Sequence, residues 1–380
     1  MTNFEFYSPT KIYFGLNRET EVGAIIKQYG FHKILLHYGK NSIKKTGLYD
    51  KVIASLKSNN IEYVELAGVE PNPKIDMVRT GCELAKGEKV EMILAVGVID
   101  SSKAIACGTC VDFDPWLFNT HEKIPVKALP VGVILTISAA GSELSNSCVI
   151  TNTEKKIKNG FNSDLVRPLF AIMNPALTFT VSKYACGIVD IMMHTMERYF
   201  VEEDSINFTD EIAFGLLKAV IKAGKKVMEN SNDFEARASL MLASSFSHNG
   251  LTGMGTKMYF TVHRLEHVLS GTYDNVSHGA GLAVLFPAWA KWVYPKLETK
   301  FLRFALEVMK VEKQDTNDKT IMAAINKLES FYKELGMPTR FKDLKIDEKA
   351  VDELIKKSTN IPSFIKLDSR DIEMIYKNAL

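Results

Sequence analysis

Three short runs of aliphatic and β-branched residues recur through the first hundred positions, and stretches with helical periodicity lie between them. The runs are Lys33–His37, Ile61–Leu66 and Met92–Val96, and the helical stretches are Lys44–Ser58 and Lys74–Lys89. Strands that alternate with helices at this rhythm form a parallel sheet covered by helices. The alternation therefore predicts an α/β N-terminal domain with a Rossmann-like parallel sheet, in which ligands bind at the carboxyl ends of the strands.

From about position 180 the pattern becomes almost entirely helical. Apolar residues at three- and four-residue spacing predict helices that include Ile188–Val201, Ile212–Met228, Phe234–His248 and Met258–Leu269. We therefore expect two domains, an α/β domain over residues 1–180 and an all-α domain over residues 181–380.

The charge balance and the apolar runs exclude several kinds of partner. Lysine and arginine total 47 against 45 acidic residues, so the net charge of +2 lacks the basic excess that nucleic acids or anionic membranes require. The N-terminus does not resemble a signal peptide, and the longest apolar stretch, Ala128–Gly141, is too short to span a bilayer. We expect a cytoplasmic protein that acts on a small molecule, with no nucleic-acid or membrane partner.

Four of the eight histidines fall in two helical windows. Asp190 and His194 are four residues apart in the first window, and His263 and His267 have the same spacing in the second, where His278 follows. Residues at this spacing share one helix face, and burying such groups unpaired costs several kcal/mol, whereas coordination satisfies them. The pattern favours a divalent metal site over a charged switch cluster or hydrogen-bonded helix contacts. Spacing alone leaves open whether His263 or His267 is the ligand.

Three imidazoles and one carboxylate suit Fe(II), Zn(II), Mn(II) or Co(II). No thiolate cluster competes, because Cys107 and Cys110 form a single CxxC late in a predicted helix and are better interpreted as buried small residues. A metal with open positions polarises a carbonyl or lowers the pKa of an alcohol. Water or a hydride could then attack, and the parallel-sheet domain favours a nucleotide and hence a hydride.

Longer segments carry a family resemblance. KIYFG near the N-terminus, HYGKNSIKKTGLYDKV, LTISAAGSELS, HGAGLAVLFPAW and FIKLDSRDIEMIYKNAL at the C-terminus together extend over essentially the whole chain. In these segments the chain resembles the iron-containing (group III) alcohol dehydrogenases, in particular their butanol dehydrogenase-like branch. The resemblance implies a dehydroquinate synthase-like architecture, with a nucleotide-binding α/β domain and a helical metal-binding, catalytic domain, and it implies a homodimer.

The resemblance also implies a role for each residue of the histidine set. It assigns the metal to Asp190, His194, His263 and His278, with Fe²⁺ favoured and Zn²⁺ as the alternative. It places His267 between the metal and the nicotinamide as a proton relay. The implied reaction is the NAD(P)(H)-linked interconversion of primary alcohols and aldehydes, in which the metal polarises the substrate oxygen and hydride passes to or from nicotinamide C4.

On the cofactor side the resemblance points to a turn after the first full strand and to residues further along the chain. These are Gly39, Lys40, Asn41, Ser42, Thr136, Ser138, Ser142 and Lys158. The turn holds no acidic residue that would bind a ribose 2′-hydroxyl, whereas Lys40, Lys44 and Lys45 would attract a 2′-phosphate. The lysines favour NADP(H) slightly over NAD(H), although a solvated start of a helix explains them equally well.

The main departure from the family lies in the expected pyrophosphate turn. The family has a strand, Gly-Gly-Gly-Ser, a hydrophobic pair and an aspartate, whereas here Gly97 is followed at once by Val98, Ile99 and Asp100, so that three residues are missing. Glycines there let backbone N–H groups and a helix N-terminus approach the phosphates. We expect Gly97 and Asp100 to mark this turn and cofactor binding to be weakened, since each lost contact is worth roughly 1.5–3 kcal/mol. The alternative is a cofactor-deficient, metal-binding relative with little or no redox activity.

Overall fold

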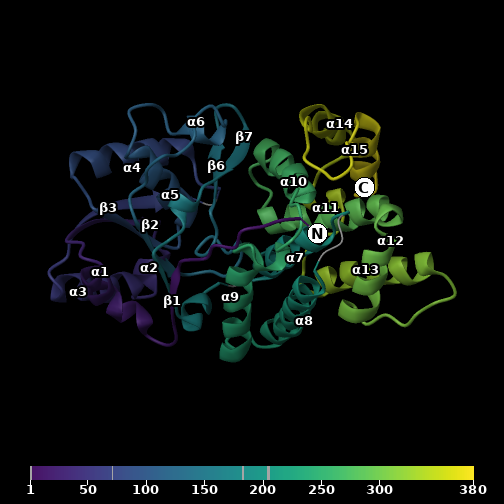
Figure 1. The fold of residues 1–380 in the computed structure, drawn as a ribbon, viewed down its shortest axis with the longest axis horizontal. Helices are drawn as coiled ribbons and strands as arrows, with labels where there is room; N and C mark the ends of the chain where they lie inside the picture. The colour runs from purple at the N-terminus through teal and green to yellow at the C-terminus, as the bar shows by residue number, and fades with distance from the viewer. Residues whose placement is uncertain (1, 71, 182–183, 203–205) are drawn as a thin grey trace. The chain divides into compact units, whose positions relative to one another are not determined.

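The computed structural model describes residues 2–70, 72–181, 184–202 and 206–380 (Figure 1). The chain forms two compact units. One unit is Ser8–Ser182, and the other combines Met1–Tyr7 with Lys183–Leu380.

The first unit is built on a six-stranded parallel sheet. In spatial order its strands are β1 (Lys11–Phe14), β8 (Phe170–Met173), β5 (Val131–Leu135), β4 (Met92–Val96), β2 (Lys33–Gly39) and β3 (Glu62–Val69). The three runs predicted from the sequence are β2, β3 and β4, which lie side by side, and the prediction of a parallel Rossmann-like sheet is confirmed. β4 and β5 are buried along their whole length, as expected for parallel strands covered on both faces.

Short helices connect these strands (Figure 1). They are α1 (Val22–Gln28), α2 (Ser42–Lys45), α3 (Leu48–Ser58), α4 (Ile75–Gly87), α5 (Ile99–Gly108) and α6 (Trp116–Asn119), with 3₁₀ turns at Arg18–Glu21, Asp164–Val166 and Pro175–Thr178. The single helix predicted over Lys44–Ser58 is wrong, because Gly47 has φ +73° and separates α2 from α3. The interpretation of the CxxC cysteines as buried holds for Cys107, whereas Cys110 lies beyond the end of α5 and is partly exposed.

An antiparallel pair of strands completes the first unit and was not predicted. β6 (Ser147–Asn152) and β7 (Ile157–Asn162) pair with each other, and β6 packs against α5. Lys156 takes a left-handed conformation, φ +51°, in the turn between them. β6 is anchored to the first turn of α5, because its Val149 N–H donates to the Asp100 carboxylate.

The second unit is helical, as predicted. Its helices are α7 (Ala185–Tyr199), α8 (Asn207–Glu229), α9 (Phe234–His248), α10 (Thr261–Thr272), α11 (His278–Val293), α12 (Glu298–Arg303), α13 (Asn317–Glu334), α14 (Glu348–Lys357) and α15 (Ser369–Lys377). Shorter turns lie at Leu251–Gly253, Tyr294–Lys296 and Phe341–Leu344, with a π-helical turn at Phe304–Val308. The helix predicted from Met258 begins later, because Phe260 caps α10 with φ +55°. Among the described residues, no helix has the length and apolarity needed to cross a membrane.

Candidate metal centre and nucleotide pocket

Four predicted metal ligands converge in the helical unit. Asp190 and His194 lie one turn apart on α7, His263 lies in the first turn of α10, and His278 is the first residue of α11. Asp190 Oδ1 is 3.4 Å from His194 Nδ1, 3.6 Å from His263 Nε2 and 3.7 Å from His278 Nε2. α7 and the consecutive helices α10 and α11 therefore bring three ring nitrogens to within 3.4–3.7 Å of one carboxylate oxygen.

The polar atoms at this point fit a cation. Asp190 Oδ1, His194 Nδ1 and His263 Nε2 are buried and have no hydrogen-bond partner among the described residues. A buried polar atom left unpaired costs about 1–3 kcal/mol, so three together are a substantial deficit. A divalent cation bonded to them removes this deficit, and one carboxylate with three imidazoles is a donor set that Fe(II) and Zn(II) accept.

Two buried glutamates orient the histidines from behind. The Glu197 carboxylate is hydrogen-bonded to His263 Nδ1 and accepts the backbone N–H groups of Val262 and His263 at 2.6 and 3.1 Å. The Glu266 carboxylate is hydrogen-bonded to His278 Nδ1. With Nδ1 engaged in this way, Nε2 of each ring is left to face the cation, which is the usual arrangement around metal-binding histidines.

The ionisation of two ligand histidines reflects their surroundings. Burial together with the neighbouring His248 and His263 holds the pKa of His194 well below its usual range, so this ring is neutral. Burial lowers the pKa of His263, but Glu197 and Asp190 outweigh burial and raise that pKa to about 9. The site is therefore one where a positive charge is stabilised by buried carboxylates.

His267 lies one turn beyond His263 on α10, and its ring centroid is 5.6 Å from that of His278. In each of two groups, the ligand atoms lie within 4.8 Å of one another. One group comes from Asp190, His194 and His263, and the other from Glu266, His267 and His278. His267 is thus close to His278 and outside the group of Asp190, His194 and His263, whereas His278 also approaches that group through its Nε2, 3.7 Å from Asp190 Oδ1.

Sequence analysis missed a shell of residues around His194. The ring of His248, the last residue of α9, has its centroid 3.9 Å from that of His194. Phe260 packs edge-on against His194 and His263, and the Arg198 guanidinium lies 4.7 Å from the Phe260 ring centroid. Arg198 Nη1 also donates to the His194 carbonyl at 2.6 Å. The left-handed backbone of Phe260 gave no signal in the sequence, because a bulky residue rarely adopts it.

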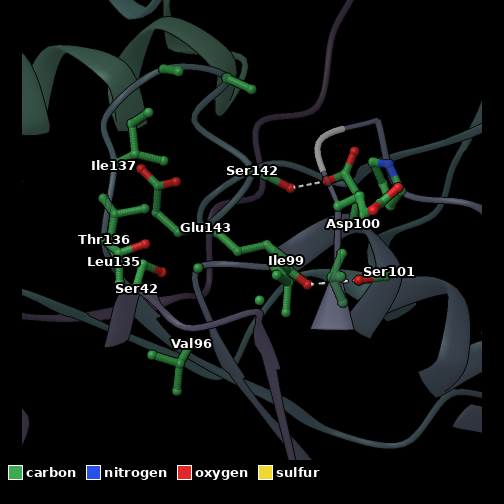
Figure 2. A pocket seen from close by; sticks show the side chains of 18 of the residues that line it. Ser42, Val96, Ile99, Asp100, Ser101, Leu135, Thr136, Ile137, Ser142 and Glu143 are labelled. Carbon is green, nitrogen blue, oxygen red and sulfur yellow. Dashed lines mark hydrogen bonds between the residues drawn. The ribbon is translucent and has the colours of Figure 1, made fainter. Parts of the chain in front are cut away.

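In the sheet unit a cavity of about 450 Å³ opens where β2, β3, β4 and β5 end. This is the edge at which parallel α/β sheets bind ligands. Figure 2 shows Thr136 and Ser42 on one side of the cavity and Asp100 on the other, with Ser142 hydrogen-bonded to Asp100. Six of the ten predicted cofactor residues line it, namely Gly39, Ser42, Gly97, Asp100, Thr136 and Ser142.

The other four predicted cofactor residues stand outside the lining. Lys40 pairs with Glu70 at 2.5 Å, and Lys158 Nζ donates to Asn72 Oδ1 at 3.2 Å. Since Glu70 and Asn72 both line the cavity, each lysine lies one contact behind its wall. The remaining two are Asn41, which is exposed before α2, and Ser138, which is wholly buried.

The turn that departs from the family is short and ordered. Only Gly97 and Val98 separate β4 from α5, and the Ile99 N–H donates to the Gly97 carbonyl at 3.1 Å. Gly97 has φ +85°, and a Cβ there would lie 2.5 Å from Thr136 Oγ1. The three missing residues leave a shortened loop. α5 begins at once and keeps ten residues.

Asp100 and Lys103 fasten α5 to the segment that follows β5. The Asp100 carboxylate accepts the Ser142 hydroxyl at 2.5 Å and the Val149 N–H at 3.0 Å. Lys103 is fully buried, and its Nζ donates to the Ser145 and Ser147 carbonyls, each at 2.9 Å. Burial lowers the pKa of Lys103 to about 8, against the opposing effect of Asp100. These contacts shape the cavity wall from behind.

His37 fixes the first turn of α5 from the opposite side. Its ring is fully buried, with Nδ1 2.9 Å from the Leu66 carbonyl and Nε2 2.8 Å from Ser101 Oγ. Because a carbonyl only accepts, Nδ1 carries the proton and the Ser101 hydroxyl donates to Nε2. Burial lowers the pKa of His37 to about 4, so the ring stays neutral. The sequence run Lys33–His37 gave no sign of this contact.

Comparisons with known proteins identify the relatives of the chain. The family model for iron-containing alcohol dehydrogenase matches residues 9–175, and that for the C-terminal domain of the Fe-containing alcohol dehydrogenase family matches residues 184–380. NADH-dependent butanol dehydrogenase A of Clostridium acetobutylicum is 37% identical over the full length of both chains. The NADPH-dependent aldehyde reductase YqhD of Escherichia coli is 32% identical, covering 94% of this chain and 93% of the relative.

Solved structures agree with the sequence matches. The crystal structure of NADH-dependent butanol dehydrogenase A from Thermotoga maritima superposes with a TM-score of 0.96 at 38% identity, covering 100% of this chain and 99% of that chain. The predicted dehydroquinate synthase-like architecture is confirmed by these neighbours. None of these similarities supports a chain without redox activity. The chain therefore belongs to the iron-containing alcohol dehydrogenase family, in its butanol dehydrogenase-like branch, and is a metal-dependent oxidoreductase of alcohols and aldehydes that uses a nicotinamide cofactor.

Proposed function

We propose that Asp190, His194, His263 and His278 hold the catalytic metal and that this metal is Fe²⁺, with Zn²⁺ as the alternative. The observation that carries the proposal is that Asp190 Oδ1, His194 Nδ1 and His263 Nε2 are buried without a hydrogen-bond partner among the described residues, and that the two ring nitrogens lie 3.4 and 3.6 Å from Asp190 Oδ1. When bound, the cation supplies Lewis acidity toward the oxygen of an alcohol or aldehyde.

The surrounding residues serve the same reaction. Glu197 and Glu266 are hydrogen-bonded to Nδ1 of His263 and His278, so that Nε2 of each ring is the atom that would bind the cation, with release of any proton it carries. His267 gives a proton to the substrate oxygen during reduction and takes it back during oxidation, as a general acid and base. Its place beside His278 supports this role.

The cavity of the sheet unit is the proposed site for the nicotinamide cofactor. Gly97, Thr136, Asp100 and Ser142 surround the point expected for the pyrophosphate, while Gly39 and Ser42 lie toward the adenosine. Ser138, Asn41, Lys40 and Lys158 act from behind these residues. When bound, the nicotinamide supplies or accepts the hydride. The α/β domain, residues 1–180, thus binds the nucleotide, and the helical domain, residues 181–380, binds the metal and carries the catalytic residues.

Butan-1-ol and butanal, and other short primary alcohols and aldehydes, are the proposed substrates. Support comes from relatives named butanol dehydrogenase at 36–37% identity over the full chain. The cofactor that the sequence favours slightly is NADP(H), because Lys40, Lys44 and Lys45 after β2 would attract a 2′-phosphate.

We further propose a cytoplasmic homodimer. Phe4, Phe6 and Tyr7 expose between 44% and 55% of their surface near the N-terminus, and a second copy of the chain would cover these rings. Size-exclusion chromatography with light scattering should give twice the mass of one chain. Replacing Phe4 and Phe6 with serine should lower that mass, and an unchanged mass would exclude this surface.

The reaction is tested with protein loaded with Fe²⁺ in the absence of oxygen. We expect butanal-dependent oxidation of NADH or NADPH that chelation abolishes and added Fe²⁺ restores. His263→Ala should lose bound metal and turnover together, while His32→Ala, a surface control outside both sites, should keep both. Metal-loaded protein that binds neither cofactor at millimolar concentration would refute the proposal and favour the cofactor-deficient alternative.

A further inference from the structure

Two buried glycines lie in the first turn of α11, just after His278, where no side chain fits. A Cβ built on Gly279 would lie 2.4 Å from the Cys186 carbonyl oxygen and 2.7 Å from the Cys186 Cα. Carbon atoms in contact are ordinarily about 3.5–4.0 Å apart. The start of α11 therefore approaches α7 this closely only because Gly279 has no side chain.

The backbone that Gly279 touches belongs to the helix that carries Asp190. Cys186 is the second residue of α7 and lies one turn before Asp190. Cys186 Sγ is also 3.4 Å from the Oγ of Ser277, the residue that precedes His278. The starts of the two helices thus touch through backbone and side chains. Moving α11 away from Cys186 therefore moves His278 away from Asp190.

The distance between His278 and Asp190 leaves little room for such a movement. His278 Nε2 is 3.7 Å from Asp190 Oδ1. Bonds from a zinc ion to imidazole nitrogen or carboxylate oxygen are about 2.0–2.2 Å long, so two atoms bound to one ion are separated by about 4.3 Å at most. Restoring ordinary contacts around a Cβ at position 279 requires a shift of roughly 1 Å. Such a shift would take the two atoms beyond the span of one ion.

Gly281 leaves space for Glu266 on α10, which is hydrogen-bonded to the same histidine. A Cβ built on Gly281 would lie 2.8 Å from Glu266 Cγ and 3.0 Å from Glu266 Oε1. The Glu266 carboxylate is hydrogen-bonded to His278 Nδ1. An added methyl group would therefore displace the carboxylate that orients the His278 ring. The two glycines thus act on one histidine, through α7 and through α10.

We propose that Gly279 and Gly281 are positioning residues of the metal centre, which hold His278 within bonding reach of the cation that Asp190 binds. The inference rests on the proposed metal centre. Alanine ordinarily stabilises a helix relative to glycine. At these two positions we expect alanine to weaken the binding of the metal instead.

The test measures the affinity of the metal-free protein for Zn²⁺, by competition with a chromophoric chelator. Gly279→Ala should weaken Zn²⁺ binding about tenfold or more, since loss of an outer partner of a ligand already costs roughly 10–100-fold. Gly281→Ala should weaken it less, because the Glu266 side chain yields more readily than the α7 backbone. Gly215→Ala should keep the wild-type affinity. It is the matched control, because Gly215 lies in α8 and a Cβ there would meet nothing within 4 Å.

A double-mutant cycle separates positioning of His278 from a general loss of packing. In the His278→Ala background, Gly279→Ala has no ligand left to displace, so it should change the Zn²⁺ affinity by less than about twofold. An equal loss in both backgrounds would mean that Gly279 acts on the fold and not on His278, which would overturn the proposal.

The same cycle distinguishes the glycines from the metal centre. If His278→Ala weakens Zn²⁺ binding and Gly279→Ala does not, the role of the glycine is wrong and the metal centre stands. If His278→Ala has no effect, the metal centre is overturned together with the glycines. Should circular dichroism show that Gly279→Ala does not fold, the cycle is run with Gly281→Ala, and an unchanged affinity in that variant overturns the proposal.

Discussion

Replacing Gly97 with alanine is expected to destabilise the sheet unit through two separate effects. Gly97 has φ +85°, a backbone region that costs an L-residue roughly 1–2 kcal/mol. The added Cβ would also lie 2.5 Å from Thr136 Oγ1, and relieving such overpacking costs typically 1–3 kcal/mol. The two effects together predict a loss of about 2–5 kcal/mol in the free energy of unfolding.

Thermal unfolding followed by circular dichroism measures this loss. For a domain of 150–250 residues each kcal/mol shifts Tm by about 2–4 °C, so Gly97→Ala should lower Tm by about 4 °C or more. Gly39→Ala is the matched control, because Gly39 lines the same cavity and its added Cβ would meet only the Val69 carbonyl, at an ordinary 3.6 Å.

A second substitution separates the two effects. Thr136→Ala in the Gly97→Ala background removes the close contact but leaves the unfavourable backbone, so it should recover about 1–3 kcal/mol and no more. Equal losses in Gly97→Ala and Gly39→Ala would show that neither the backbone conformation nor the contact constrains this turn. If Thr136→Ala recovers no stability, the close contact with Thr136 is not a cause of the loss, and only the backbone conformation remains.

The glutamates hydrogen-bonded to the ligand histidines should strengthen metal binding. Glu197→Gln and Glu266→Gln are each expected to weaken the affinity for the metal roughly 10–100-fold, measured by competition with a chelator. An unchanged affinity would mean that these glutamates only pack against the histidines. His267→Ala should lower butanal turnover while the metal content, measured by mass spectrometry, stays at the wild-type level; equal loss of both would contradict a proton relay. The pKa of His37 is about 4 in the folded protein and about 6.5 when unfolded, so the unfolded chain binds more protons between these values. Stability should therefore fall by up to about 3 kcal/mol as pH drops from 6.5 to 4, and His37→Val should flatten this part of the profile of Tm against pH. An identical profile in both proteins would exclude His37 as its source.

The parts of the fold that the sequence predicted are those where burial dominates. The runs Lys33–His37 and Met92–Val96 are strands because their aliphatic side chains are buried in the sheet. β6 and β7 were missed because SCVITN and IKNGFN are short and rich in polar residues, and because β6 packs on α5 and β7 on α6, contacts that the sequence does not report. The break at Gly47 was missed because the helical spacing of apolar residues continues across it.

The candidate sites divide in a similar way. Spacing and family resemblance singled out Asp190 and His194, since both lie on one face of one helix. Glu197, His248 and Glu70 were missed, because each reaches its site through packing between elements that no local spacing reports. For Glu70 the signal was available in the parallel pairing of β2 and β3, but only once the register was known.

The proposed metal ligands come from α7 and from the consecutive helices α10 and α11, so a bound cation cross-links one helix to a pair that lies much later in the chain. Such a cation binds the folded state and not the dispersed ligands of the unfolded one, and at a thousand times its dissociation constant it contributes about 4 kcal/mol to folding. The supply of metal is then expected to affect the stability of the folded protein as well as its catalytic rate.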